Sequence, residues 1–482
     1  MSSTPGYHVG ISLEHAWRRH RVFMWAVVLT GFFLVSFVGN LERGLLETTE
    51  GRYAECALEM LSSGNFLEPT LDSAPHWAKP PLAYWSMAAG MLVAGENEAG
   101  ARLGTALSFL GTGLVLAWLA WSLWGEFAAL TTLGVYATSV LPILGATFLS
   151  TDMVLTLWES LAVACYVLWA LAPGQSKKLL FAMWTAFGLA FLTKGPPGLL
   201  PLLAIIPWHV WRFRDGKVFL PAGLMIFVII GLSWFAAIII KRPELLSFFL
   251  KEEVVGRLTS DAFHRNPEWW KPFVIYVPVL FAGQLHWFWM MGNPFRTWQS
   301  MPPEQRTFLG LWIVLPLAVF CLAKSRLPLY VLPLSIPMTM FIAFGIAHRR
   351  DRIPLRRTAA IFAGAIFLAM AARILLGVLP LHQNMRALHE AILAAGEGET
   401  VALVKDKAYG LQFYAGGKLS WIGAGSGDRK QALDDFLESA SGKYRVVAKK
   451  KDTELIVSTL AAEGLNGTQA EHAGWVIVSF EK

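Results

Sequence analysis

Residues 218–240 read VFLPAGLMIFVIIGLSWFAAIII, an unbroken run without a charged side chain. A helix of about 20 apolar residues crosses the roughly 30 Å of hydrocarbon in a bilayer, so this run is long enough to span a membrane. Similar runs lie on both sides of it, at 22–40, 102–123, 127–148, 153–172, 179–193, 197–211, 272–291, 307–323, 328–347 and 358–380. Together they predict about eleven spans and an all-α polytopic membrane protein.

The composition agrees with this pattern. Of the 482 residues 55% are hydrophobic and 16% are charged, and the mean hydropathy is +0.47. This is more apolar side chain than soluble domains bury around their cores. The net charge of +7 would fit a nucleic-acid ligand, but the basic residues mostly flank the apolar runs, as membrane topology predicts. We therefore expect no nucleic-acid partner, and the spacing of the three cysteines suggests no metal or disulfide chemistry.

Loop charge decides the topology. The basic cluster Arg18, Arg19 and Arg21 precedes the first run, which has no cleavage site and is expected to remain as a signal anchor. The short segment 80–95 begins with Pro-Pro, and we predict an interfacial helix there, because a crossing would place Lys177, Lys178 and the Arg212 cluster on the side opposite the basic N-terminus. The outward loops are then 41–101, 149–152, 194–196, 241–271 and 324–327.

The composition changes near Leu381 towards Gly, Lys, Glu and Asp. Strand-like runs at 400–404, 445–448 and 475–480 alternate there with helical patterns at 429–439 and 453–463. We predict a transmembrane domain at 1–380, with its first periplasmic loop at 41–101, and a small periplasmic α/β domain at 381–482.

The first outward loop is rich in carboxylates, from Glu47 to Glu55. These acids are equally typical of the first turn of an amphipathic helix capped by Thr48 or Thr49. Two further features recur on the outward side: Lys79 stands before a rigid Pro-Pro pair, and Asp152 stands at the mouth of a span. Lys79 could also be an ordinary lysine whose ammonium snorkels to the membrane surface. Thr151 or Asp152 could also be the N-cap of the helix that follows.

Basic residues recur on the outward side, where topology does not favour them. They include Lys194 before Gly-Pro-Pro, the loop with Arg257, His264 and Arg265, and Lys324 with Arg326. Several cations in short turns suggest one shared anion, and a phosphate-bearing lipid is the natural candidate at a membrane surface. Carboxylates beside such cations suit displacement at a sugar carbon with the lipid phosphate leaving.

Taken together, these motifs resemble those of ArnT-like and protein-mannosyltransferase-like enzymes of the GT-C class. The likeness runs from about the first span to Tyr330, and it implies the GT-C fold, with about 11–13 transmembrane helices plus interfacial helices, and a sugar donor carried on polyprenyl phosphate. Its specific pieces are Glu50 to Glu55, Lys79 to Leu82 with Tyr84-Trp85, Thr151-Asp152, Thr193 to Gly195, His264-Arg265 and Lys324 to Tyr330.

The resemblance also implies roles for single residues. Glu50, from the acidic pair of the first loop, and Asp152 would be the catalytic acids. The substrate-binding positions would surround the carrier phosphate or the cavity, and they are Arg52, Tyr53, Lys79, Tyr84, Lys194, Arg257, His264, Lys324, Arg326 and Tyr330.

Two positions depart from the family pattern. Thr49 stands where the family has a leading Asp, so Glu50 or Glu47 substitutes or the activity is altered. Ala78 stands where the family commonly has a Glu, which can share a metal with a histidine matching His264. No cofactor is therefore assigned, and a divalent metal stays an open alternative.

The resulting hypothesis is a multi-pass inner-membrane glycosyltransferase whose active site faces the bacterial periplasm. It would transfer a sugar, with inversion, from a polyprenyl-phosphate carrier to lipid A or another glycolipid. The alternatives are a protein O-glycosyltransferase and a non-catalytic lipid-binding or transport scaffold of the same fold. The expected partners are the lipid-linked donor, the acceptor and membrane lipids.

Overall fold

The computed structural model describes residues 6–39, 43–47, 49–171, 176–256, 266–349, 354–379, 384–405, 407–417, 419–423 and 428–482. The chain divides into two compact units. The first unit comprises residues 1–38, 77–86 and 103–373, and the second comprises 39–76, 87–102 and 374–482.

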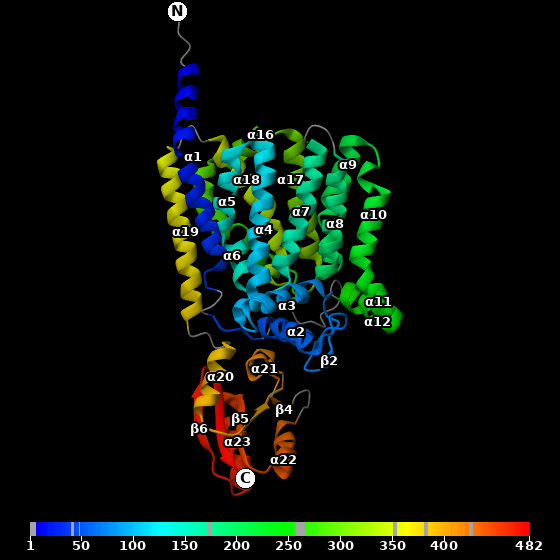
Figure 1. The fold of residues 1–482 in the computed structure, drawn as a ribbon, viewed down its shortest axis with the longest axis vertical. Helices are drawn as coiled ribbons and strands as arrows, with labels where there is room; N and C mark the ends of the chain where they lie inside the picture. Colours follow the sequence, from blue (N-terminus) through cyan, green and yellow to red (C-terminus); the bar gives the residue numbers. More distant parts are fainter. Residues whose placement is uncertain are drawn as a thin grey trace, which may run out of the picture. The chain divides into compact units, whose positions relative to one another are not determined.

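The first unit is a bundle of apolar helices (Figure 1). Its helical elements are α1 (Gly6–Phe37), α4 (Glu98–Trp124), α5 (Glu126–Thr138), α6 (Val140–Thr147), α7 (Asp152–Leu171), α8 (Lys177–Lys194), η1 (Pro196–Leu199), α9 (Leu202–Phe213), η2 (Lys217–Phe219), α10 (Pro221–Phe227), η3 (Val228–Leu232), α11 (Ser233–Lys241), α12 (Leu245–Phe248), η4 (Phe249–Gly256), α14 (Lys271–Leu280), η5 (Ala282–Gln284), α15 (Leu285–Met291), α16 (Pro294–Ser300), α17 (Pro303–Leu322), η6 (Pro328–Leu334), α18 (Ser335–His348) and α19 (Leu355–Val378).

Within the described residues, eight helical segments are long and apolar enough to cross a membrane, and a bent pair would make nine. The bent pair is α5 with α6, which meet at 61° around Ser139, where the expected span 127–148 is broken. The run 218–240 forms α10, η3 and α11, which together cover Pro221–Lys241. The polytopic helical fold predicted from the sequence is confirmed.

Two further expected spans, 179–193 and 197–211, correspond to α8 and to η1 with α9. Helix α8 packs along α7 in the bundle, but its 18 residues include Lys177, Lys178 and Lys194. Helix α9 has only 12 residues, about 18 Å at roughly 1.5 Å per residue. By length and composition neither counts among the eight, which is why the sequence count of about eleven is higher.

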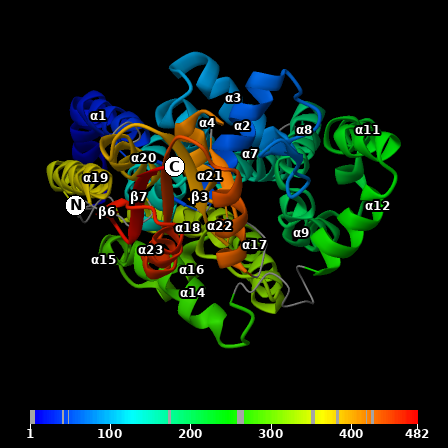
Figure 2. The same cartoon turned by 90° about the horizontal axis from the view of Figure 1, so that it is seen from below.

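Helices from the two ends of the first unit lie side by side. Both views place α1 next to α19 (Figures 1 and 2). Their contact is close, because a Cβ at Gly31 would lie 2.6 Å from the Ile366 side chain. Further inside, the Phe32, Phe109 and Tyr136 rings pack together between α1, α4 and α5. Such packing holds together spans that are far apart in the sequence.

The second unit contains residues 374–482, which form a five-stranded sheet with its helices and are called the sheet domain below, and much of the first loop. Its elements are α2 (Thr49–Ser63), β1 (Thr70–Leu71), β2 (Ala74–Pro75), α20 (Met385–Ala394), β3 (Glu399–Leu403), α21 (Tyr409–Ala415), β4 (Ser420–Ile422), α22 (Arg429–Ser439), β5 (Lys443–Lys449), η8 (Lys450–Asp452), α23 (Thr453–Ala462), β6 (Thr468–His472) and β7 (Trp475–Glu481). The first five residues of α4 and the last five of α19 also belong to this unit. Helix α3 (Leu82–Ala94) is divided between the units, and its 13 residues span about 20 Å, too short to cross about 30 Å of hydrocarbon.

The five-stranded sheet has the order β4-β3-β5-β7-β6, with β3 parallel to β4 and β5 and with β7 antiparallel to its neighbours. Apolar residues alternate along β3, so that Ala402 packs towards α20 and α21 while Leu403 packs towards α22 and α23. The sheet is therefore covered by helices on both faces. The predicted α/β fold of this segment is confirmed. The boundary near residue 381 stays a prediction, because the same compact unit includes residues 39–76.

Candidate functional site

Lys194 is the last residue of helix α8. Gly195 follows it with φ of 74°, a backbone conformation that favours glycine, and its N–H donates to the Phe191 carbonyl at 2.7 Å. Pro196 and Pro197 then start a tight 3-10 turn. The Lys-Gly-Pro-Pro sequence thus ends the helix directly after the lysine, and the positive charge lies where the helix dipole is negative.

Asp152 is the first residue of the neighbouring helix α7. Its carboxylate accepts a hydrogen bond from the Lys194 ammonium, in an ion pair whose side chains are about 90% buried. A carboxylate at a helix start and a lysine at a helix end are each favoured by the helix dipoles. Packing of α7 against α8 therefore joins two predicted residues that lie 42 positions apart.

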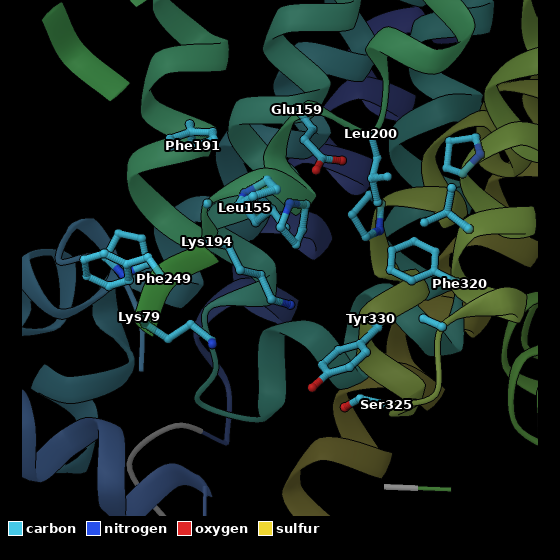
Figure 3. Close-up of a pocket in the computed structure, with 18 of the residues that line it drawn as sticks. Lys79, Leu155, Glu159, Phe191, Lys194, Leu200, Phe249, Phe320, Ser325 and Tyr330 are labelled. Atoms are coloured by element: carbon cyan, nitrogen blue, oxygen red, sulfur yellow. The ribbon is translucent and has the colours of Figure 1, made fainter. Parts of the chain in front are cut away.

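The same lysine faces a cavity of about 490 Å³ within the first unit (Figure 3). Its ammonium lies 4.6 Å from the centre of the Tyr330 ring, which comes from η6. The cavity is also lined by Lys79, whose ammonium donates to the Ala78 carbonyl at 2.5 Å, and by Ser325. The structure thus brings the predicted residues Lys79, Lys194 and Tyr330 to one cavity.

Most of the cavity wall is apolar. Side chains from α8, α11, η4, α17 and η6 contribute, among them Phe191, Phe235, Phe249, Trp312 and Phe320. Of the described lining residues, only Lys79, Lys194, Glu159 and Tyr330 carry ionisable side chains. A cavity with clustered cations and long apolar walls can hold an amphiphile with an anionic head.

Glu159 was not predicted from the sequence. It lies on α7, it is 3% exposed, and it faces the cavity (Figure 3). A signal was present, because Asp152, Leu155 and Glu159 follow the helical spacing that places residues on one face. The predicted site residues of this helix ended at Asp152, its first residue.

Arg326 makes contacts that differ from those expected of a phosphate ligand. It is 3% exposed, and its guanidinium donates to the carbonyls of Asn266 and Glu268, both at 2.8 Å, and of Cys321 at 2.9 Å. These bonds tie the end of α17 to the chain before α14. Among the described lining residues, neither Arg326 nor Lys324 appears, so their phosphate-binding role stays a prediction.

Glu50 lies in the second unit, inside a buried cluster of charges. Its two carboxylate oxygens accept from both Arg43 Nη atoms at 2.8 and 2.6 Å, and Oε2 also accepts from the Leu46 N–H at 2.8 Å and from Arg102 Nη2 at 3.0 Å. The carboxylate is 3% exposed. Its surroundings are those of a residue that holds the loop, and its catalytic role stays a prediction.

Two other carboxylates of the first loop, Glu47 and Glu55, have fewer partners that stabilise their negative charge. Burial raises the pKa of Glu47 to about 7, although its Oε2 accepts from the Gly410 N–H at 2.8 Å and Arg52 and Lys449 lie near. Burial raises the pKa of Glu55 to about 8, and Glu59 and Asp72 add to the shift. Both groups are therefore partly or mostly protonated near neutral pH.

The remaining predicted residues fall into two sets. Arg52 and Tyr53 lie in helix α2, with the Arg52 guanidinium 5.4 Å from the Tyr53 ring centre, and Tyr84 is fully buried in α3. Arg257 and His264 lie outside the described residues. Over the ranges that the structure does describe, no three His, Cys, Asp or Glu side chains are arranged to hold a metal ion.

A family model matches about half of the chain. Residues 24–249 match the family described as dolichyl-phosphate-mannose-protein mannosyltransferase. This range runs from within α1 to the end of α12, and so includes Lys79, Asp152 and Lys194 of the site.

Curated proteins give longer matches. An undecaprenyl phosphate-alpha-4-amino-4-deoxy-L-arabinose arabinosyl transferase 2 of Pseudomonas fluorescens (strain Pf0-1) is 32% identical over 337 residues, 67% of this chain and 60% of the relative. The corresponding transferase of Enterobacter sp. (strain 638) is 31% identical over 364 residues, 73% of this chain and 64% of the relative. The chain therefore spans less than two thirds of the length of these relatives.

The fold matches a solved structure over nearly its whole length. The crystal structure of ArnT from Cupriavidus metallidurans bound to undecaprenyl phosphate has a TM-score of 0.77 and 21% identity, and the match covers 95% of this chain and 97% of that chain. The two proteins thus have the same fold.

Proposed function

Because this chain belongs to the ArnT-like family of GT-C membrane proteins, we propose that it is a glycosyltransferase of the bacterial inner membrane. It takes a sugar from a polyprenyl-phosphate carrier and transfers it to an acceptor on the periplasmic side. The names of the curated relatives suggest the donor class, an aminopentose on undecaprenyl phosphate. The proposed acceptor is lipid A or another glycolipid.

The cavity between α7, α8, α17 and η6 is the observation that carries this proposal. Lys79 and Lys194 supply two ammonium groups for a phosphate, and the apolar wall suits a polyprenyl chain. The Asp152 carboxylate holds the Lys194 ammonium, and the Tyr330 ring lies against it. The lysine is thereby oriented before the ligand arrives, which lowers the cost of binding.

In the proposed reaction an acceptor oxygen attacks the anomeric carbon of the sugar. The bond from that carbon to the phosphate oxygen breaks, and the electron pair leaves with the polyprenyl phosphate. Lys79 and Lys194 stabilise the negative charge that develops on the leaving group. If the acceptor is itself a phosphate, its oxygen is already ionised and needs no strong base, which accommodates Thr49 in place of the leading Asp.

The test is transfer by the purified protein in lipid nanodiscs, with a synthetic polyprenyl-phosphate aminopentose as donor and lipid A as acceptor. Lys194→Met removes the charge beside the leaving group, so we expect kcat to fall about a hundredfold to a thousandfold. Lys178→Met is the matched control, because Lys178 is exposed at the opposite end of the same helix. Wild-type kcat in Lys194→Met, or no transfer by the unaltered protein, would contradict the proposal.

A further inference from the structure

Glu159 is a buried acid in an otherwise apolar part of the cavity wall. It lies two helical turns after Asp152 on α7, about 10 Å further along the helix axis at roughly 1.5 Å per residue. Figure 3 shows its carboxylate pointing into the cavity, on the side opposite Lys79, Tyr330 and Ser325. Leu155 lies between the two acids on the same helix and also lines the cavity.

Within the described part of the chain, no hydrogen bond or ion pair is formed by Glu159. Lys194 and Asp152 are the charged groups that act on it electrostatically. The Lys194 ammonium, however, already forms its ion pair with Asp152 and lies against the Tyr330 ring. A carboxylate in apolar surroundings is costly unless a hydrogen-bond donor or a cation compensates it, and acids in membrane spans are commonly functional.

The cavity therefore offers two kinds of polar group at two places. Lysines stand at one place, and a single carboxylate stands at the other. A ligand complementary to both carries an anion and a cation, separated by an uncharged part. The volume of about 490 Å³ is within the range of small-molecule sites and leaves room for a sugar between them.

We propose that Glu159 is a specificity residue that binds a protonated amine on the donor sugar while Lys79 and Lys194 bind the phosphate. This inference rests on the proposed function, because it assigns the sugar-bearing donor to the same cavity. Glu159 does not take part in bond breaking. Its carboxylate pairs with the ammonium of the bound donor, and this pairing selects an aminosugar over the same sugar with a hydroxyl in place of the amine.

The experiment separates donor binding from turnover. The 482-residue chain in nanodiscs is titrated at neutral pH with two synthetic donors, a polyprenyl-phosphate aminopentose and its hydroxyl analogue, and both Kd values are measured. Glu159→Gln keeps the size of the side chain and removes the charge. We expect the preference for the amine donor to fall about tenfold to a hundredfold, as for the loss of a charge-assisted hydrogen bond.

Two controls define the effect. Leu155→Ala enlarges the same cavity without changing charge, so it should weaken both donors alike. Polyprenyl phosphate without a sugar should bind Glu159→Gln and the unaltered protein equally well. Equal weakening of both donors and of the bare lipid phosphate in Glu159→Gln would show that Glu159 acts only through Lys194, and it would overturn the inference.

An unchanged preference in Glu159→Gln would also overturn it. Turnover of the unaltered protein reports separately on the proposed function. A protein that binds the amine donor through Glu159 without transferring the sugar would refute the transferase and leave the specificity residue standing.

Discussion

Glu50 and Asp152 were predicted together as reacting acids, but their surroundings differ. Asp152 forms one ion pair beside a cavity, with Lys194. Glu50 is enclosed by the guanidinium groups of Arg43 and Arg102. Removing one partner of a buried ion pair is expensive because the other charges stay buried without compensation. Glu50 is therefore expected to stabilise the first loop.

Replacing Glu50 with Gln should lower the stability of the second unit by about 3–5 kcal/mol, the typical cost of breaking a buried pair. The apparent melting temperature of the full chain in detergent, followed by tryptophan fluorescence, measures this. Glu96→Gln is the control, because Glu96 is exposed in the same loop and should leave the melting temperature unchanged. A Glu50→Gln protein that melts normally but transfers no sugar would instead support the catalytic role.

At the scale of elements, the sheet domain is joined to the first loop through helices α2 and α21. The backbones approach closely, since a Cβ at Gly51 would lie 2.2 Å from the Gly410 nitrogen. Asp72 pairs with Lys407 and accepts from Gln412 Nε2 at 3.1 Å. The loop that carries Glu50, Arg52 and Tyr53 is thus held by contacts from residues more than three hundred positions later in the chain.

Gly51→Ala tests this contact. In an open helix position, alanine in place of glycine stabilises by about 0.5–1 kcal/mol. At Gly51 the added methyl overlaps the Gly410 backbone, so we expect a lower melting temperature of the full chain instead. Gly364→Ala is the matched control, because Gly364 lies in helix α19 with open space around its Cβ position and should not destabilise. The two substitutions should therefore shift the melting temperature in different directions, and equal shifts would contradict the tight contact.

At the scale of the whole molecule, the proposed function requires the cavity to open on the periplasmic side. Lys177 and Lys178 start helix α8, and Lys194 ends it, so they lie at opposite ends of one helix. If α8 crosses the bilayer, the positive-inside rule predicts that this pair lies in the cytoplasm and that Lys194 lies on the periplasmic side. This orientation is the one that the proposed function requires.

Single-cysteine labelling measures this orientation. In a background with Cys56, Cys165 and Cys321 replaced by alanine, Ser62→Cys and Ser176→Cys each place one thiol at an exposed position. A membrane-impermeant maleimide applied to spheroplasts should label Ser62→Cys, and Ser176→Cys only after permeabilisation. Labelling of Ser176→Cys in intact spheroplasts would reverse the topology and remove the periplasmic site.

Local patterns in the sequence were sufficient to predict most of the apolar spans and three strands of the sheet. The apolar run 218–240 and its counterparts specify spans because a bilayer leaves a long uncharged segment few alternatives to a helix. The runs 445–448 and 475–480 lie within β5 and β7, and the run 400–404 overlaps β3 as far as Leu403, because β-branched and apolar residues favour a sheet covered on both faces. Strand β4, strand β6 and helix α21 were missed because each has only three to seven residues. Helix α20 was also missed, although Asn384 caps it and Met385, Leu388 and Ile392 form a buried apolar face.

The sequence by itself determined a polytopic membrane fold, an α/β segment after it, and the motif residues of a known family. Only the tertiary structure decided which of these residues meet: Lys79, Lys194 and Tyr330 line one cavity, and Asp152 pairs with Lys194. It also showed Arg326 bonded to backbone carbonyls, and Glu159 facing the cavity. Contacts between distant segments depend on how the helices pack. Whether side chains fit at a close contact depends on residues from several segments, so no single stretch of sequence determines it.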